Sequence, residues 1–236
     1  MILSALKVSI IAIVSAVAGT LVAAAALLTR SDRLFFTLVK TWAHLVLGVA
    51  GVRVTVEGAE RVDFSRSYII VANHASLFDI PSVIVGIPAD IRIVYRKDLG
   101  KIPFFGWGLR IQNVYIPIDR ENRQDALQTI GETQARIARG GCVLMFGEGT
   151  RTPDGSLQQF KRGPFNLASK AGVPVVPLAI NGSFGVLQKG SLRIRPGTIT
   201  LVLDRPIGPS GTDGKQAELL LRDQVRAAIE RNLKEE

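Results

Sequence analysis

A stretch of 22 uncharged and almost wholly apolar residues, from Val8 to Thr29, constrains this chain more than any other feature. As an α-helix the stretch would be about 33 Å long, because each residue adds about 1.5 Å. A helix that crosses the hydrocarbon core of a bilayer needs about 20 apolar residues. Basic residues flank the stretch, before it at Lys7 and after it at Arg30, Arg33 and Lys40. The sequence therefore predicts a membrane-anchoring helix, and the basic excess after it favours a cytoplasmic body.

The N-terminal region leaves alternatives open at two points. Lys7 and the small residues 23–25 also fit a cleaved secretory signal peptide, although the apolar stretch is long for one. The apolar segment 34–50 is predicted to form a second helix, either in the membrane interface with Trp42 at head-group depth or packed on the soluble body. In both cases His44 is interpreted as a polar spot on that helix. Whether 8–29 spans the bilayer or enters one leaflet stays open.

The composition limits the chemistry that the chain can carry. Of its 236 residues, 47% are apolar and 21% are charged, which is typical of a folded chain rather than a disordered or coiled-coil one. Cys142 is the only cysteine, and His44 and His74 are the only histidines. These counts exclude an internal disulfide, a cysteine-built metal site and a three-histidine zinc site. We therefore expect neither a metal nor another cofactor.

The charge balance indicates an anionic partner. There are 29 basic and 20 acidic residues, a net charge of +9, which favours nucleic acid, anionic lipid or a phosphorylated substrate. No nucleic-acid-binding module is recognisable, so a nucleic-acid partner is not expected. The sequence also contains no phosphate-binding Walker loop, no dinucleotide fingerprint and no G-x-S-x-G turn. These absences argue against a nucleotide-driven enzyme and against a serine hydrolase.

After residue 50, short β-type runs alternate with amphipathic segments. Strands are predicted at 52–58, 67–73, 91–95, 114–118, 142–146 and 173–180, and helices at about 79–87, 122–139, 164–171 and 214–233. The late runs 191–197 and 198–204 are predicted to form a pair of strands around Pro196-Gly197. This alternation favours an α/β fold with a mostly parallel sheet flanked by helices. The chain thus divides into membrane-anchoring helices, 1–50, and one further domain, 51–236.

The segment NHASLFD, residues 73–79, is the strongest chemical signal. It follows a predicted buried strand and opens a predicted helix, a position that functional sites in α/β folds favour. A loop that enters a helix can bring His74 and Asp79 together, so that the carboxylate holds one ring nitrogen and the other nitrogen faces a substrate. The structural alternative is that Asn73 or Ser76 caps the helix and His74 only hydrogen-bonds the backbone.

Three further segments contain candidate anion-binding residues. FGEGTRT, 146–152, follows another predicted strand, and its glycines allow the backbone conformations that other residues avoid. Thr150 and Arg151 could hold a phosphate. Glu148 could brace the arginine or contact substrate hydroxyls. FKRGP, 160–164, places Lys161 just before a helix that starts with proline. Arg120 ends the run YIPIDR, 115–120. Taken alone, the first two segments favour an ordinary glycine-rich or basic turn, and Arg120 could simply pair with Asp119.

Together these segments form an ordered set that resembles a known family. NHASLFD, YIPIDR, FGEGTRT and VPVVP (173–177) are similar to the four blocks of the glycerolipid acyltransferases, which include 1-acylglycerol-3-phosphate and glycerol-3-phosphate acyltransferases. The short chain with an N-terminal membrane segment resembles the bacterial lysophosphatidic acid enzymes most. The resemblance implies that 51–236 is an acyltransferase catalytic domain. It also implies a location at the cytoplasmic face of the bacterial inner membrane, because the acyl donor is made in the cytoplasm.

The resemblance further implies a reaction and a role for individual residues. An acyl chain would pass from acyl-CoA or acyl carrier protein to the sn-2 hydroxyl of 1-acylglycerol-3-phosphate and give phosphatidic acid. His74 would act as general base and Asp79 would orient it, with no acyl-enzyme step. The implied substrate-binding residues lie in or near the four blocks: Arg96, Arg120, Glu148, Gly149, Thr150, Arg151, Lys161 and Pro177.

Three positions depart from the family pattern. The third block usually reads F-P-E-G-T-R-S, so that Gly147 and Thr152 replace a proline and a serine, and Arg96 stands where lysine is usual. Gly147 is predicted to loosen its loop, which leaves open another lysolipid acceptor, such as a lyso-aminolipid, another lysophospholipid or glycerol-3-phosphate. An alternative of a different class is a non-catalytic membrane protein that binds anionic lipid through its basic surface.

Overall fold

The structure is a computed structural model that describes residues 2–29, 31–111, 114–118, 141–209 and 214–234. Two long helices open the chain, α1 (Ile2–Leu28) and α2 (Asp32–Ala50). Both are long and apolar enough to cross a membrane, which by itself is weak evidence that they do. The Ser31 hydroxyl accepts a hydrogen bond from the Leu34 amide and starts α2, and Gly51 ends it with a φ of 76°.

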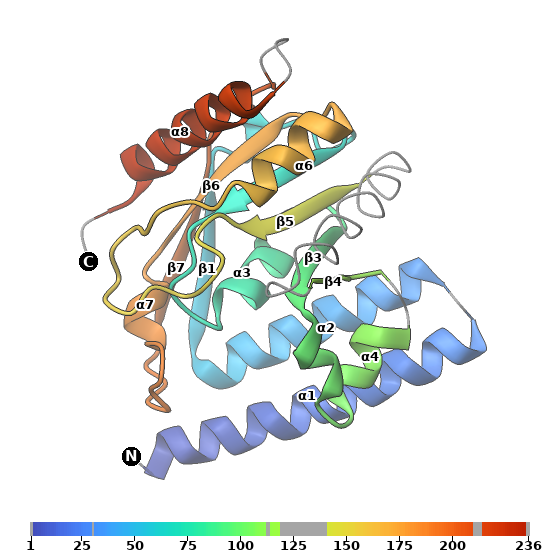
Figure 1. Cartoon of the computed structure of the whole chain (residues 1–236). Helices are drawn as coiled ribbons and strands as arrows, with labels where there is room; N and C mark the ends of the chain where they lie inside the picture. The colour runs from blue at the N-terminus through green and yellow to red at the C-terminus, as the bar shows by residue number, and fades with distance from the viewer. Residues whose placement is uncertain (1, 30, 112–113, 119–140, 210–213, 235–236) are drawn as a thin grey trace.

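The centre of the molecule is one seven-stranded sheet (Figure 1). Its strands lie in the order β1-β7-β6-β2-β5-β3-β4, and every neighbouring pair is parallel except β6 and β7. This confirms the predicted α/β fold with a mostly parallel sheet. The strands are β1 (Val52–Glu57), β2 (Tyr68–Ala72), β3 (Ile91–Arg96), β4 (Ile116–Ile118), β5 (Cys142–Phe146), β6 (Val175–Asn181) and β7 (Gly197–Leu203).

Helices cover both faces of the sheet, as Figure 1 shows. On one face lie α2 and α3 (Asp79–Gly86), with α1 outside α2; on the other lie α6 (Gly163–Ala171) and α8 (Lys215–Asn232). Alternate residues of each strand supply the two hydrophobic cores, so that Ile70 and Ala72 of β2 face α2 and α3 while Ile69 and Val71 face α6 and α8. The remaining short elements of the described ranges are α4 (Phe105–Ile111), α7 (Ser183–Val186) and two 3-10 turns, Ala59–Arg61 and Lys97–Lys101.

The second helix packs on the body, as one of its two predicted placements required. Its inner face, including Ala43, Leu47 and Ala50, is buried in the same core as α3 and the sheet. The Trp42 indole donates a hydrogen bond to the Ser15 hydroxyl of α1 over 3.0 Å, so this side chain is used in helix packing, while His44 is exposed. The division predicted at residue 50 therefore falls at a helix end, but α2 and the sheet share one core.

Most predicted elements are found within two residues of their predicted ends, and one prediction is wrong. Residues 191–197 do not pair with 198–204: only Gly197–Leu203 forms a strand. Both edges of this strand are already taken, by β1 on one side and by β6 on the other, so no edge is left for a hairpin partner. The strand predicted at 114–118 is shorter, Ile116–Ile118, and the helix predicted at 122–139 lies outside the described residues.

Candidate active site

The candidate site lies where two neighbouring parallel strands end. Strands β2 and β5 are adjacent and parallel, with Ala72 paired to Phe146 in register. The segments that follow them, 73–79 and 147–152, therefore leave the same edge of the sheet side by side. Ligand sites of open α/β sheets form at this carboxyl edge. The topology thus brings together two of the segments that the sequence singled out.

His74 and Asp79 form the predicted pair. The distance from Nδ1 of His74 to Oδ2 of Asp79 is 2.8 Å. The Asp79 side chain is completely buried, while 14% of the His74 side chain is exposed. With its proton on Nδ1, the imidazole donates to Asp79 and leaves Nε2 as an acceptor, the arrangement of a base with an orienting carboxylate.

The Asp79 carboxylate also organises the loop that precedes α3. The same Oδ2 atom accepts hydrogen bonds from the amides of Ala75 and Ser76, over 2.8 and 2.9 Å. Asn73 caps no helix; its side-chain amide exchanges two hydrogen bonds with the backbone of Ile180 on β6, over 2.9 and 2.8 Å. No side chain in the described part of the chain caps α3, from Ser76 or elsewhere, and the His74 ring is bound by Asp79, so the simple capping alternative is wrong.

Phe146 and the 147–152 segment hold His74 from the other side. The Phe146 ring stacks on the His74 imidazole with a centroid separation of 3.8 Å and an interplanar angle of 14°. The His74 amide donates to Oε1 of Glu148 over 2.7 Å, and the His74 carbonyl accepts from the Thr152 amide over 2.8 Å. Both backbone groups and one ring face of His74 are thus fixed by β5 and the segment after it. The sequence analysis placed Phe146 at the end of a strand and at the start of the FGEGTRT segment but gave its ring no role.

Glu148 is a buried carboxylate with two backbone partners. Its Oε1 atom accepts from the His74 amide, and Oε2 accepts from the Gln158 amide over 3.2 Å. It does not brace Arg151, which was one of its two predicted roles; contact with substrate stays a prediction. Burial raises the pKa of Glu148 to about 7, with a smaller raising contribution from the nearby Asp79 and opposition from the two amide hydrogen bonds.

Gly147 is closely packed rather than loose, contrary to expectation. Its amide donates to the Ala72 carbonyl over 2.9 Å, and its carbonyl accepts from the Lys161 amide over 2.7 Å. A Cβ atom at this position would lie 2.7 Å from the ring of Phe160. A proline here would clash with that ring and would lack the amide hydrogen that β2 binds. The glycine is therefore required by its neighbours, and it does not loosen the loop.

The cationic candidates surround this site with more exposed side chains. Gly149 has a φ of 75° and donates to the Phe146 carbonyl, so that Thr150 and Arg151 follow a tight turn. The Lys189 ammonium donates to the Arg151 carbonyl over 3.2 Å, which adds a cation that the sequence reasoning missed. The side chains of Arg151 and Lys161 have no hydrogen bond or ion pair in the part of the chain that the structure describes.

Two other predicted residues, Arg96 and Pro177, lie on strands other than the two that lead into the His74 site. Arg96 ends β3 and forms a salt bridge with Asp98 at the surface. Pro177 is buried inside β6 and pairs with Val71 in register, so it shares the face of the sheet that α6 and α8 cover, opposite to the α3 face. Arg120 lies outside the described residues. Among the described residues there is also no group of three or more His, Cys, Asp and Glu side chains able to hold a metal ion.

Comparison with known proteins places this geometry in a family. The family model described as Acyltransferase matches residues 53–181, more than half of the chain. A 1-acyl-sn-glycerol-3-phosphate acyltransferase of Chlamydomonas reinhardtii is 31% identical over 77% of this chain and 53% of its own length. One from Pseudomonas aeruginosa is 30% identical over 84% of this chain and 77% of its own length. The chain spans about half the length of several of the curated relatives that it matches.

A solved structure matches almost the whole chain. The crystal structure of the 1-acyl-sn-glycerophosphate acyltransferase PlsC from Thermotoga maritima has a TM-score of 0.78 and 28% sequence identity. The match covers 98% of this chain and 94% of that one, so it includes both N-terminal helices as well as the sheet. The residues matched by the family model run from β1 to the end of β6, and this chain belongs to the acyltransferase family.

Proposed function

We propose that this chain transfers an acyl group from an acyl thioester to the sn-2 hydroxyl of 1-acylglycerol-3-phosphate and so makes phosphatidic acid. The observation that carries the proposal is the His74–Asp79 contact of 2.8 Å, held in place by backbone hydrogen bonds to Glu148 and Thr152. The names of the relatives from Chlamydomonas, Pseudomonas and Thermotoga support the same acceptor.

In the proposed mechanism His74 acts twice on the same proton. Its Nε2 atom removes the proton of the acceptor hydroxyl while the oxygen attacks the thioester carbonyl carbon. The tetrahedral intermediate collapses, the carbon–sulfur bond breaks, and the imidazolium returns the proton to the leaving thiolate. The buried Asp79 carboxylate stabilises the imidazolium between the two steps and keeps the ring in the orientation that presents Nε2.

The position of the Ser76 hydroxyl supports direct transfer without an acyl-enzyme intermediate. Ser76 follows His74 by two residues, and a serine beside a histidine base is a common nucleophile. Here the Ser76 side chain is fully buried and its hydroxyl donates to the Leu187 carbonyl over 2.8 Å. Ser76 therefore fixes the loop against the end of α7. The acceptor hydroxyl itself is left as the nucleophile in this proposal.

The acceptor phosphate would be bound by the exposed cations around His74. Arg151 and Lys161 come from segments that are hydrogen-bonded to the His74 loop or to Gly147. An arginine can bind a phosphate through two parallel hydrogen bonds, and a lysine adds a point charge. Arg96, Arg120, Glu148, Gly149, Thr150 and Pro177 remain predicted substrate-binding residues. The packing of Gly147 under Phe160 removes the argument that this glycine offered for a different lysolipid acceptor.

Membrane association through α1 and α2 is part of the proposal. Along its length α1 contacts the body: Lys7 donates to the Ala50 carbonyl over 2.7 Å, Ser15 accepts from Trp42, and Val22 is buried against the rest of the chain. This packing supports a retained anchor rather than a cleaved signal peptide. It also supports α1 lying along one leaflet, because the body follows the helix instead of meeting one of its ends. The cytoplasmic face of the bacterial inner membrane remains the proposed location.

The test measures thiol release by membranes that carry the protein, with 1-acylglycerol-3-phosphate supplied or omitted. Acyl-CoA and acyl carrier protein are tried as separate donors, and other lysophospholipids and glycerol-3-phosphate as separate acceptors. We expect release that requires 1-acylglycerol-3-phosphate and that is lost in His74→Ala. A matched control is Leu77→Ala, since this side chain is 56% exposed beside the site. Release with another acceptor alone would contradict the proposed substrate, and lipid binding without any release would favour a non-catalytic binding protein.

A further inference from the structure

The segment from Ile102 to Ile111 exposes an unusual amount of apolar surface for part of a catalytic body. Four of its large side chains are between 43% and 48% exposed, namely Ile102, Phe104, Trp107 and Ile111. They come from the turn before α4 and from α4 itself, about 80 residues after α1 in the sequence. We call these four residues the 102–111 patch. Large exposed apolar groups gathered in one place mark an interaction surface more often than scattered ones do.

The backbone that carries this patch is strained at Phe104. Phe104 has a φ of 62° and is the only non-glycine residue with a positive φ among the described residues. The Phe105 amide donates to the Pro103 carbonyl over 2.7 Å, which closes a three-residue γ-turn around Phe104. A γ-turn with a positive φ is rare and strained, above all for a bulky residue. The ring of Phe104 is nevertheless half exposed to solvent. Burial of that ring within this chain therefore does not offset the free energy of the strain.

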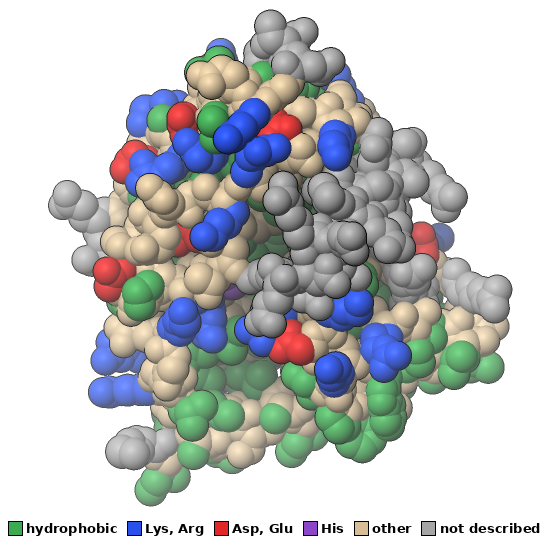
Figure 2. All heavy atoms as spheres, in the orientation of Figure 1, with side chains coloured by type: hydrophobic (Ala, Val, Ile, Leu, Met, Phe, Trp, Pro, Cys, Tyr) green, Lys and Arg blue, Asp and Glu red, His purple; other side chains and the backbone are tan. Residues whose placement is uncertain are grey.

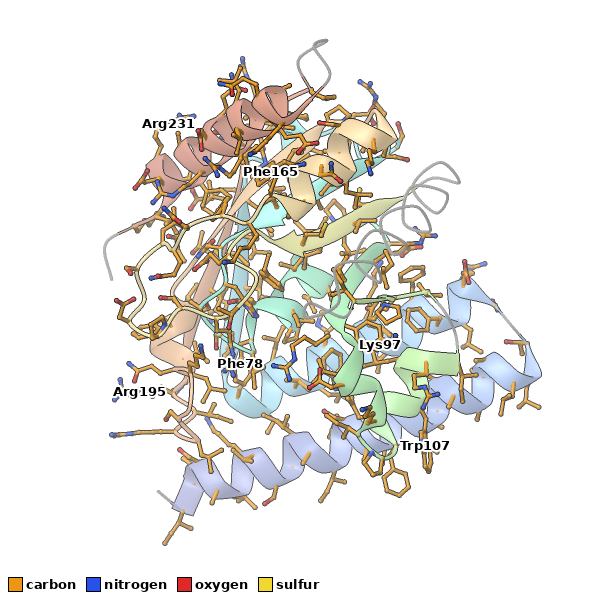
Figure 3. All side chains as sticks on the ribbon, viewed as in Figure 1. Phe78, Lys97, Trp107, Phe165, Arg195 and Arg231 are labelled. Carbon is orange, nitrogen blue, oxygen red and sulfur yellow. The ribbon has the colours of Figure 1, made fainter. Side chains whose placement is uncertain are left out.

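The segment that carries the patch is packed against α1. The carbonyl oxygen of Phe104 lies only 2.5 Å from where a Cβ atom on Gly19 would be, and Gly108 touches the same turn of α1. Helix α1 exposes Ile13, Val17 and Leu21, which are spaced four residues apart and share the side of the helix that faces away from Gly19. Figure 3 shows Trp107 at the lower edge of the molecule beside α1. Apolar side chains of α1 and of the 102–111 patch thus lie along the same lower edge of the molecule (Figure 2).

Basic residues border this surface and indicate what covers it. Lys101 directly precedes the patch in sequence and Arg110 lies within it, and neither has an ion-pair partner in the described part of the chain. On the other flank, Pro196 packs on Gly51 near the Lys7 ammonium, and Arg195 beside it projects above α1. Figure 2 shows hydrophobic side chains along the lower edge, over α1 and α4, with lysines and arginines directly above them. An apolar surface with a basic border matches an anionic lipid leaflet.

We propose that the 102–111 patch inserts into an anionic leaflet beside α1 and forms a second membrane contact, supplied by the catalytic body itself. Trp107 and Phe104 would lie at the level where aromatic rings favour the membrane interface, with Lys101 and Arg110 among the head groups. The contact through Gly19 fixes the patch to α1, so the body is held at a defined tilt rather than hanging from a flexible anchor. The inference extends the membrane association proposed above and is separable from the chemistry.

The two tryptophans allow a direct test. In Trp42→Phe the only remaining indole is Trp107, and in Trp107→Phe it is Trp42, which is half-buried between the two helices. Each full-length variant is reconstituted in vesicles of phosphatidylcholine and phosphatidylglycerol, with phosphatidylcholine brominated on its acyl chains in half of the samples. We expect brominated lipid to quench Trp107 several-fold more strongly than Trp42. Acrylamide in the water should quench Trp107 in the vesicles only weakly.

Two outcomes would overturn the inference. If Trp107 stays open to acrylamide and insensitive to brominated lipid while the protein sediments with the vesicles, α1 alone contacts the membrane. If Trp107 is protected from acrylamide but insensitive to brominated lipid, a second copy of the chain covers the patch. Phe104→Trp in a variant without the two native tryptophans gives an independent probe of the same patch. Thiol release by the Trp42→Phe protein at the wild-type rate shows that it is folded, and absence of release in the wild-type protein as well would concern the proposed function instead.

Discussion

The His74 loop and the cationic border of the site differ in how completely their polar groups are satisfied. Around His74, the ring, the backbone amide and the backbone carbonyl each have a buried or half-buried partner in Asp79, Glu148 and Thr152. The Arg151 and Lys161 side chains, in contrast, have no partner among the described residues and are partly or fully exposed. The chemistry is thus built on a preorganised core, whereas recognition of a charged acceptor depends on side chains that can adjust.

This contrast predicts that mutations in the core of the site change turnover or stability, and that mutations at its border change apparent affinity. The largest effect is expected for Asp79→Asn. The amide has nearly the shape of the carboxylate but loses the charge that stabilises the imidazolium, so we expect kcat to fall about 10³-fold with little change in KM. Steady-state measurement of kcat and KM checks this expectation. The control is Asp63→Asn, a change in an exposed turn. A loss of less than about fivefold would remove Asp79 from the mechanism.

Glu148→Gln should change how stability depends on pH. Because the folded pKa of Glu148, about 7, lies above its ordinary value of 4.5, the native state binds the proton more tightly. Stability is therefore complete below about pH 4.5 and is lost as the pH rises towards about 7, by on the order of 2 to 3 kcal/mol. In Glu148→Gln this loss should disappear, although its amide can accept only one of the two backbone hydrogen bonds.

The measurement is the free energy of unfolding of both proteins at several values between about pH 4.5 and pH 7.5. Since other groups titrate in both proteins, the difference between the two curves isolates the Glu148 contribution. Parallel curves would show that Glu148 keeps an ordinary pKa and that its burial is relieved by the two amides.

Gly147→Ala tests whether the core of the site is as tightly packed as it appears. The added methyl group would meet the Phe160 ring at 2.7 Å, so we expect a loss of about 1 to 3 kcal/mol in the free energy of unfolding. Gly185→Ala is the matched control, since nothing lies within 4 Å of a Cβ atom there. Denaturant unfolding of the two variants should separate them. Equal stability would mean that Phe160 moves freely and that the loop is loose after all.

The smallest effect is expected at the border. Arg151→Gln should raise KM for the lysolipid acceptor about tenfold and leave kcat within about twofold, because it removes attraction to the phosphate and leaves His74 in place. The dependence of KM on salt should also weaken. Arg231→Gln on α8 serves as control, as this arginine pairs with Asp204 far from the site (Figure 3). A fall in kcat larger than the rise in KM would place Arg151 in the chemistry itself.

The sequence predicted what depends on local pattern. Alternating and β-branched runs gave the strands of the sheet, and proline near the start of α6 marked that helix. The His74–Asp79 pair could also be predicted, because a loop-to-helix turn brings residues five apart into contact. The four ordered blocks resembled a family to which the chain does belong. These features all lie within short stretches of chain.

What the sequence did not predict depends on contacts between distant residues. The role of Phe146 requires β2 and β5 to be neighbours in register, and that of Asn73 requires β6, 107 residues away. The direction of the Glu148 carboxylate and the space that Phe160 takes beside Gly147 follow from tertiary packing. The pair of strands predicted at 191–204 failed for the same reason, since a local pattern does not show which strand edges are already occupied.

The most direct test of the account is a single-turnover experiment with wild type and His74→Ala. Purified protein in lipid vesicles is mixed rapidly with less than one equivalent of acyl-CoA or acyl carrier protein, whichever donor supports turnover. Direct transfer by a His74 base predicts no thiol release until 1-acylglycerol-3-phosphate is added, then thiol and phosphatidic acid at equal rates, and neither product in His74→Ala. A burst of thiol without acceptor, or transfer by His74→Ala at a rate near that of wild type, would contradict it.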